Sequence, residues 1–258
     1  MTSNENFKEG AAIIFGATGG IGRHVALSFA RAGADVAVVW RSKEEAAASL
    51  AENIKKLGRK ATTHHCDVLE DGAVDKAMNA ARGDHGQLHT MVWGAGPLVE
   101  QVYFADLTEA QWRRAIDTEV HGFFRASHHA VRIMREQGGG SIIHLGSAGD
   151  MRWPEKDVLS VAPKATNEAL IKCVAKEEGR HGIRANSILV GVIEAGMFLE
   201  LSKQGVFDEA WTEEVHKNLA LKRWGQPEEV GDVAVFLAST AAGYVTGQQI
   251  AVAGGYGV

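Results

Sequence analysis

The chain has 258 residues, of which 45% are hydrophobic, and this length and composition suit one large domain with a sizeable core. Its formal net charge of −5, without a basic run, argues against a nucleic-acid-binding surface. No run approaches the ~18 apolar residues of a membrane helix, and the polar residues 1–10 hold no signal-peptide stretch.

The thiols and imidazoles indicate no metal site. The two cysteines, Cys66 and Cys173, lack metal-ligand spacing, so we interpret both as core thiols of a protein in a reducing cytoplasm. Two histidine pairs, His64-His65 and His128-His129, are adjacent in sequence. Adjacent side chains point to different sides of a strand or helix, so surface or packing roles rank ahead of metal binding.

Apolar strand patterns alternate with helical patterns along the chain. Near-continuous apolar strands such as Val36–Val39 suit a parallel sheet covered on both faces. Right-handed crossovers then make a Rossmann-type, doubly wound α/β/α domain that binds ligands at the carboxyl ends of its strands. The predicted strands are Ala11–Phe15, Asp35–Trp40, Lys60–His65, Thr90–Trp93, Ser141–Leu145, Arg184–Leu189 and Gln249–Val252. The predicted helices are Arg23–Ala32, Lys43–Leu57, Asp71–Arg82, Thr108–Glu136, Leu159–Glu178 and Pro227–Leu237.

One stretch interrupts this alternation. Residues 194–221 contain Met197, Phe198, Leu199, Phe207 and Trp211. This apolar content favours a helical flap that covers a substrate, and an ordinary pair of surface helices is an equal alternative.

A glycine-rich loop follows the first strand and opens the first helix. The run Gly16-Ala17-Thr18-Gly19-Gly20-Ile21-Gly22 has the layout that places a dinucleotide pyrophosphate at a helix N-terminus. Gly16 suits the tight turn, Gly20 the approach to phosphate, and Gly22 close packing of the helix on the sheet.

With this loop, the chain resembles the short-chain dehydrogenase/reductase family over nearly its whole length. Asp67-Val68 matches the pair that holds the adenine, and Gly191 with Ile193 matches the segment that binds the carboxamide. Residues 226–230 and 244–248 match the C-terminal signature. Ala95 and Gly96 fit the family's Asn-Asn-Ala-Gly motif, but Trp93 and Gly94 replace its asparagines.

The residues at the end of the second strand indicate whether the cofactor is NAD(H) or NADP(H). An acidic residue there would bind the ribose 2′-hydroxyl and repel a 2′-phosphate. The chain instead has Arg41 and Ser42, which suit charge-assisted hydrogen bonds to phosphate. We therefore expect NADP(H) rather than NAD(H); the alternative is that Arg41 is a solvated loop residue.

The resemblance implies a catalytic serine, tyrosine and lysine. Ser147 falls at the serine position and Lys164 at the lysine position, but Ser160 stands where the tyrosine is expected. None of the tyrosines has a lysine four residues later. A serine hydroxyl is far less acidic than a phenol, so Ser160 either binds a substrate oxygen or water, or caps a helix.

The family's asparagine also has a substitute. Its position falls on Glu119, which shares a helix face with Ile116 and Phe123. A carboxylate among apolar residues is costly unless it is paired. We expect an ion pair with Lys164, and the alternative is a different acid–base apparatus that includes Glu119.

The loop of residues 150–157 is expected on the substrate side. Its charges, Asp150 and Arg152 among them, either bind a polar substrate or lie idle in solvent, and we favour the second interpretation slightly.

The sequence thus predicts an NADP-dependent oxidoreductase with an atypical acid–base site, acting on a carbonyl or hydroxyl of a small molecule. A non-redox enzyme on this scaffold, such as a lyase, isomerase or dehydratase, and an inactive nucleotide-binding homologue are the alternatives. The family resemblance implies a homotetramer or homodimer, built from the long helices Thr108–Glu136 and Leu159–Glu178 and the C-terminal Ala251–Val258.

Overall fold

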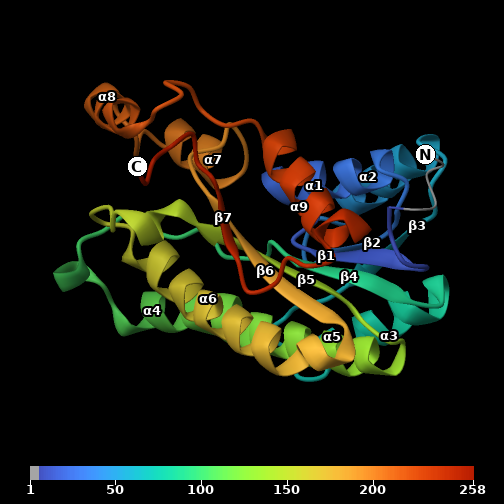
Figure 1. Ribbon diagram of the computed structural model, residues 1–258. Helices are drawn as coiled ribbons and strands as arrows, with labels where there is room; N and C mark the ends of the chain where they lie inside the picture. The colour runs from blue at the N-terminus through green and yellow to red at the C-terminus, as the bar shows by residue number, and fades with distance from the viewer. Residues whose placement is uncertain (1–5) are drawn as a thin grey trace.

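A seven-stranded parallel sheet forms the centre of the protein. The computed structural model describes residues 6–258, so the first five residues of the polar N-terminal stretch lie outside the described part. The strands lie in the order β3-β2-β1-β4-β5-β6-β7 (Figure 1), and every neighbouring pair is parallel. Their bounds are β1 Ala11–Phe15, β2 Asp35–Trp40, β3 Ala61–His65, β4 Leu88–Trp93, β5 Gly140–Ser147, β6 Ile183–Val190 and β7 Gln249–Val252. The predicted fold class is confirmed.

Helices cover both faces of the sheet (Figure 1). One face carries α1 Gly20–Arg31, α2 Glu44–Lys56 and α9 Pro227–Ala238, and the other carries α3 Ala73–His85, α4 Glu109–Ile116, α5 Gly122–Glu136 and α6 Val158–Glu178. Successive residues of β1 enter opposite cores, since Ile13 packs with Phe123 below the sheet and Ile14 packs with Phe29 above it. This double burial explains the near-continuous apolar strands.

The strand order reverses direction between β1 and β4. The chain winds outward through β2 and β3 on one side of β1, and through β4 to β7 on the other. In open parallel sheets the carboxyl ends of the strands at such a reversal border a crevice that binds ligands. The topology therefore places the candidate site above Phe15 and Trp93, the last residues of β1 and β4.

The strands next to this crevice are longer than the sequence predicted. Strand β5 ends at Ser147 and β6 at Val190, and their last residues pair with each other in parallel register. The ladder thus reaches the predicted catalytic serine and holds its backbone.

The predicted helical stretch Thr108–Glu136 is helical from Glu109 to Glu136, but it is not one regular α-helix. A π-helical segment, Asp117–His121, separates α4 from α5. Such segments insert an extra residue into a helix and change the side-chain register. The inserted turn lies at Glu119, whose side chain is buried.

Residues 194–221 form two short helices after β6. Helix α7, Met197–Lys203, and helix α8, Glu209–Asn218, stand beyond the carboxyl ends of the strands, on the same side as the C-terminus (Figure 1). The helical content of this predicted flap is confirmed.

The prediction that both cysteines are core thiols is correct for Cys66 and wrong for Cys173. Cys66 is buried, and burial raises the pKa of its thiol to about 11. Cys173 is exposed, because it lies on the side of α6 opposite Ile171 and Ala175, which face the sheet.

The adjacent histidines point apart, as predicted. His64 and His129 are buried, whereas His65 and His128 are exposed. Among residues 6–258, no helix combines the length and apolarity needed to cross a membrane.

Candidate active site

A cavity of about 610 Å³ lies at the carboxyl ends of the strands, under helices α7 and α8. It joins the glycine loop, the ends of β4, β5 and β6, and the start of α6 into one continuous space. Most of the predicted site residues line it: Gly20, Ile21, Gly22, Ala95, Gly96, Glu119, Ser147, Ser160, Lys164, Gly191 and Ile193.

The other predicted cofactor residues do not line this cavity: Gly16, Thr18, Arg41, Ser42, Asp67 and Val68. Arg41 and Ser42 are exposed at the end of β2. The next residue, Lys43, does line the cavity. Sequence reasoning missed Lys43, although its place in a cationic run with Arg41 was a usable signal.

The glycine loop forms a cradle that suits a phosphate group. The loop turns at Gly16 with a φ of +76°, and a Cβ at Gly20 would stand 2.1 Å from the backbone nitrogen of Gly196. Helix α1 starts at Gly20, and its N-cap Gly19 has no side chain to satisfy the first amides. Free amides at a helix N-terminus favour an anion, so the loop fits a nucleotide pyrophosphate.

Glu119 and Lys164 form an ion pair at the centre of the cavity. The Lys164 ammonium donates to Glu119 Oε1, and the two side chains are 14% and 4% exposed, respectively. Trp93 Nε1 donates to the other carboxylate oxygen over 3.4 Å. A Cβ at Gly96 would stand 2.3 Å from Glu119 Oε1, so only glycine leaves room for this carboxylate. The predicted pairing is present in the structure.

Ser147 is poised to donate a hydrogen bond into the cavity. Its Oγ accepts a hydrogen bond of 3.0 Å from the backbone N–H of Gly149. Because the oxygen is the acceptor there, the hydroxyl proton stays free for a substrate oxygen.

Ser160 is not a helix cap. Helix α6 begins at Val158 with Asp157 at the N-cap, which puts Ser160 inside the first turn. Ser160 and Lys164 are four residues apart and therefore lie on the same face of α6, toward the cavity that both line.

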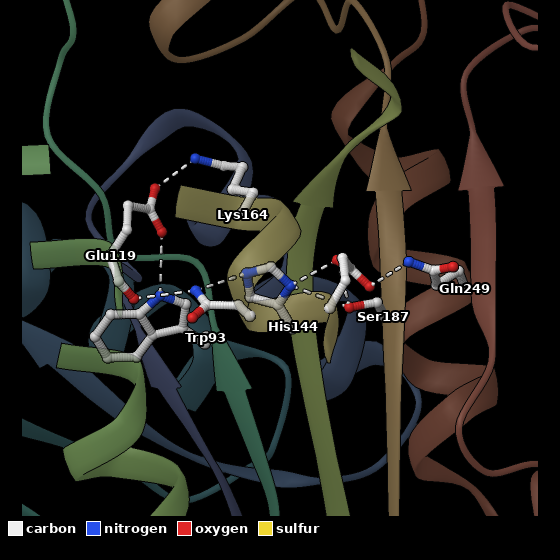
Figure 2. A network of polar contacts seen from close by, with 8 residues as sticks. Trp93, Glu119, His144, Lys164, Ser187 and Gln249 are labelled. Atoms are coloured by element: carbon white, nitrogen blue, oxygen red, sulfur yellow. Dashed lines mark hydrogen bonds and ion pairs between the residues drawn. The ribbon is translucent and has the colours of Figure 1, made fainter. Parts of the chain in front are cut away.

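A buried polar network continues from Glu119 through the core to the sheet edge (Figure 2). Asn167 Nδ2 donates to the main-chain carbonyl of Glu119 over 3.0 Å and lies 3.3 Å from His144 Nε2. His144 Nδ1 lies 2.9 Å from Glu168 Oε1. Since Asn167 donates to Nε2, we assign the imidazole proton to Nδ1, which then donates to Glu168.

The far end of this network reaches two further strands. Ser187 of β6 donates to Glu168 Oε1 over 2.8 Å, and Gln249 of β7 donates to Oε2 over 3.0 Å. Burial favours the neutral carboxyl, but hydrogen bonds from His144, Ser187 and Gln249 outweigh it and hold the pKa of Glu168 below its usual range. Glu168 is therefore a buried anion that its neighbours satisfy.

Comparisons with known proteins agree over almost the whole chain. A family model described as enoyl-(acyl carrier protein) reductase matches residues 16–257. A cyclohexanol dehydrogenase of Acinetobacter sp. (strain SE19) is 34% identical over 253 residues, which cover 98% of this chain and 97% of that protein. The chain belongs to the short-chain dehydrogenase/reductase family.

Solved structures of the family superpose closely on this protein. A short-chain type dehydrogenase/reductase from Mycobacterium ulcerans has a TM-score of 0.90 and 28% identity, covering 97% of this chain and 90% of that one. A 7α-hydroxysteroid dehydrogenase complexed with NADH and 7-oxo glycochenodeoxycholic acid has a TM-score of 0.88 and 28% identity, covering 99% and 97%. The named relatives are oxidoreductases that act on small molecules with nicotinamide cofactors.

Two residues that the resemblance matches to family asparagines contact each other. The indole of Trp93 donates to the carboxylate of Glu119. Trp93 is fully buried between Phe15 and Phe123, at ring-centroid distances of 5.4 and 5.8 Å. The two side chains thus form one hydrogen-bonded unit beside the cavity.

The loop of residues 150–157 differs from the expectation of idle charges. Arg152 donates to the main-chain carbonyls of Tyr256 and Val258, the latter over 3.0 Å, so it ties down the C-terminus. Asp150 Oδ1 is buried without a partner among the described residues, and burial raises the pKa of this carboxyl to about 6. The favoured interpretation of these charges as idle in solvent is wrong, and substrate binding by this loop stays a prediction.

Several polar residues of the site escaped the sequence analysis. His144, Asn167 and Glu168 lie in segments that were interpreted only as apolar strand and helix. Polar residues within such segments are unusual and indicate buried groups that need hydrogen-bond partners. Gln101 also lines the cavity, from a loop that no motif marks, and Asp157 lines it at the end of the loop 150–157 that was expected on the substrate side.

Proposed function

We propose that this protein is an NADP(H)-dependent oxidoreductase that interconverts a carbonyl and a hydroxyl group on an apolar, ring-containing small molecule. The observation that carries the proposal is the single cavity that joins the phosphate cradle to Ser147 and Lys164 and then to an aromatic wall. Glu119 and Ser160 make its acid–base site atypical.

The roles of the cavity residues follow from their contacts. A bound nicotinamide supplies or accepts the hydride. Ser147 donates a hydrogen bond from its free hydroxyl to the substrate oxygen and so orients the carbonyl. Lys164, held by Glu119, presents its ammonium to the nicotinamide ribose. Ser160 binds a substrate oxygen or a water on the same face of α6.

The walls of the cavity support an apolar substrate with a ring. Phe198, Phe207 and Trp211 of segment 194–221 line it, and the rings of Phe207 and Trp211 stack with centroids 4.0 Å apart. Stacked aromatic faces suit flat or alicyclic carbon frameworks. The names of two relatives fit this chemistry, since one is a cyclohexanol dehydrogenase and another binds a 7-oxo bile acid. Segment 194–221 acts in this proposal as the substrate flap.

The preference for NADP(H) rests on charge at the end of β2. Arg41, Ser42 and Lys43 follow that strand, and no acidic residue stands among them to repel a 2′-phosphate. We expect Arg41→Ala to weaken NADPH binding about 10-fold or more and to change NADH binding little. Fluorescence titration of both cofactors measures this, and equal affinities in the unmodified protein would refute the preference.

A turnover screen tests the reaction itself. Cyclic and aromatic ketones are offered with NADPH, nicotinamide absorbance is followed, and the alcohol product is identified by mass spectrometry. We expect turnover that Ser147→Ala lowers about 10²–10⁴-fold. Product formation without any change in nicotinamide absorbance would instead support a non-redox enzyme. Cofactor binding with no product from any ring ketone would support an inactive homologue.

A further inference from the structure

Asp157 is a carboxyl group in the cavity wall that has no role so far. It precedes Ser160 by three residues and Lys164 by seven, and this spacing puts the three side chains on one face of α6. All three line the cavity. Asp157 makes one side-chain hydrogen bond, accepted by Oδ1 from Gln101 Nε2 over 3.0 Å. Its side chain does not cap α6, although it stands at the N-cap.

The other proton-bearing groups near Asp157 in the cavity wall are already paired or are weaker acids: Lys164 pairs with Glu119, and burial raises the pKa of the Tyr256 phenol. Glu119 is already paired with the Lys164 ammonium and the Trp93 indole. Ser147 and Ser160 are aliphatic hydroxyls, which give up a proton only at strongly alkaline pH. A carboxyl that lacks a cationic partner and keeps its proton near neutrality is the group suited to general acid catalysis.

Burial shifts Asp157 toward the protonated form. Removal from water raises the pKa of its carboxyl, while the Gln101 hydrogen bond and the more distant Lys164 charge pull the pKa of Asp157 back only in part. No salt bridge to Asp157 occurs among residues 6–258.

We propose that Asp157 is the proton donor and acceptor of the reaction, positioned by Gln101. In the reducing direction, the carbonyl carbon receives hydride, the carbonyl π electrons form the new O–H bond, and the proton in that bond comes from the Asp157 carboxyl. Asp157 is left as a carboxylate and is reprotonated from solvent. In the oxidising direction the carboxylate takes the hydroxyl proton. This assignment rests on the proposed redox function.

The helix geometry explains how a side chain at position 157 can exchange a proton with the substrate. Side chains of a helix lean toward its N-terminus, so the space above Ser160 extends over the preceding turn. A serine leaves that space open, and Asp157 begins that turn. A carbonyl oxygen bound to Ser147 and Ser160 is thereby exposed to the Asp157 carboxyl.

The test compares Asp157→Asn with Asp106→Asn, an exposed aspartate on the segment that follows Gln101. We expect Asp157→Asn to lower kcat for ketone reduction about 10²–10⁴-fold and to abolish its decline at alkaline pH. Cofactor affinity and melting temperature should stay close to those of the unmodified protein. Asp106→Asn should leave the pH profile unchanged.

A second variant should shift the pH dependence of ketone reduction instead of abolishing it. Gln101→Leu deletes the hydrogen bond that stabilises the ionised carboxyl, so the pKa of Asp157 should rise further. The alkaline limb of the reduction profile should therefore move to higher pH. A carbon-13 NMR titration of the cofactor-free protein, with the Asp157 signal assigned from Asp157→Asn, should show the same upward shift without any turnover.

The outcomes separate this proposal from the proposed function. If Asp157→Asn changes turnover by less than about 3-fold, the role of Asp157 is overturned. The same holds if Gln101→Leu leaves the pH profile of reduction unchanged. In both cases the proposed oxidoreductase function stands. An Asp157 signal that titrates at the pH of an ordinary aspartate also overturns the role of Asp157. If the unmodified protein transfers hydride to none of the ketones, the proposed function is overturned, whatever the result of the NMR titration.

Discussion

Glu119 shows how a single buried charge is made tolerable. Its side chain is almost completely removed from water, which strongly disfavours a carboxylate unless neighbours compensate. The Lys164 ammonium supplies the opposite charge, and the Trp93 indole supplies a further hydrogen bond. The neighbouring Gly96 supplies the space. Removing any one partner therefore leaves a group that the others cannot satisfy.

We predict that Glu119→Gln destabilises the protein by about 3 kcal/mol, because it leaves the Lys164 ammonium without its counter-charge in a largely buried place. Urea unfolding measures the change. The double variant Glu119→Gln/Lys164→Met should recover part of the loss, since neither charge is then buried alone.

The exposed pair of Glu109 and Arg113 is the matched control. Its side chains are 74% and 71% exposed, so Glu109→Gln should cost below about 0.5 kcal/mol. Equal effects of the Glu109 and Glu119 substitutions would mean that the Glu119–Lys164 pair is open to water in solution.

Among the secondary-structure elements, the π-helical segment between α4 and α5 decides where Glu119 points. Regular helical spacing over residues 108–136 would give one continuous side-chain register. The extra residue of Asp117–His121 rotates the following turns, and the Glu119 carbonyl accepts from Asn167 of α6 as well as from the Gly122 backbone. Two neighbouring helices are joined in this way beside the cavity.

For helices α7 and α8, we predict that the aromatic wall sets substrate choice. Trp211→Ala should lower kcat/KM for a bicyclic ketone about 10–100-fold, because a large stacking surface is lost, and should change that for acetone little. Steady-state kinetics with both ketones measure the ratio.

Trp112→Ala, on the surface of α4, is the control for loss of an indole away from the flap. A parallel loss for bicyclic ketone and acetone in Trp211→Ala would argue that the residue stabilises the flap and does not select the substrate.

The polar network ties α6 to strands β5, β6 and β7, and we predict a pH-dependent contribution from Glu168. The folded pKa of this carboxyl is lowered, so its stabilising effect is present above the unfolded pKa and is lost as pH falls through the folded value. Glu168→Gln should destabilise the protein by about 1–3 kcal/mol at pH 7.

Thermal unfolding of both proteins from pH 7 down to the acid range checks this prediction for Glu168. The difference between the unmodified protein and Glu168→Gln should shrink as the pH falls below about 4. A constant difference across the range would contradict a charged Glu168.

The whole molecule exposes surfaces that suit self-association. Phe124 on α5 is 51% exposed and Phe236 on α9 is 43% exposed. The edge strand β7 is open along one side, where Gln249 and Ala251 are exposed. Large exposed rings and an open strand edge are characteristic of faces that pair with a second copy.

We therefore predict a homo-oligomer, a tetramer or a dimer, with α5 in one of its interfaces. Sedimentation velocity at micromolar concentration should give a mass above that of one chain, and Phe124→Glu should lower it by placing a charge in the interface. A monomer before any substitution would refute the assembly, and an unchanged mass for Phe124→Glu would remove α5 from it.

Local sequence determined the fold and the nucleotide cradle. Strands such as Ile13–Phe15 are apolar on both faces, and this pattern by itself requires a sheet covered by helices on both sides. The loop from Gly16 to Gly22 joins a strand to a helix within a few residues, so its geometry depends on neighbours in the chain. The pair of Glu119 and Lys164 was also predictable, because a family position and a charge argument agreed.

The tertiary structure alone decided which polar groups share the cavity. Asp157, Gln101 and the His144–Glu168 network come from segments far apart in sequence, and no local pattern records that they meet. The same holds for Arg152, whose partners are carbonyls at the C-terminus, and for the π-helical turn that local helix propensity does not encode. Periodicity reports which face of an element is buried, whereas the contacts across that face depend on how whole elements pack.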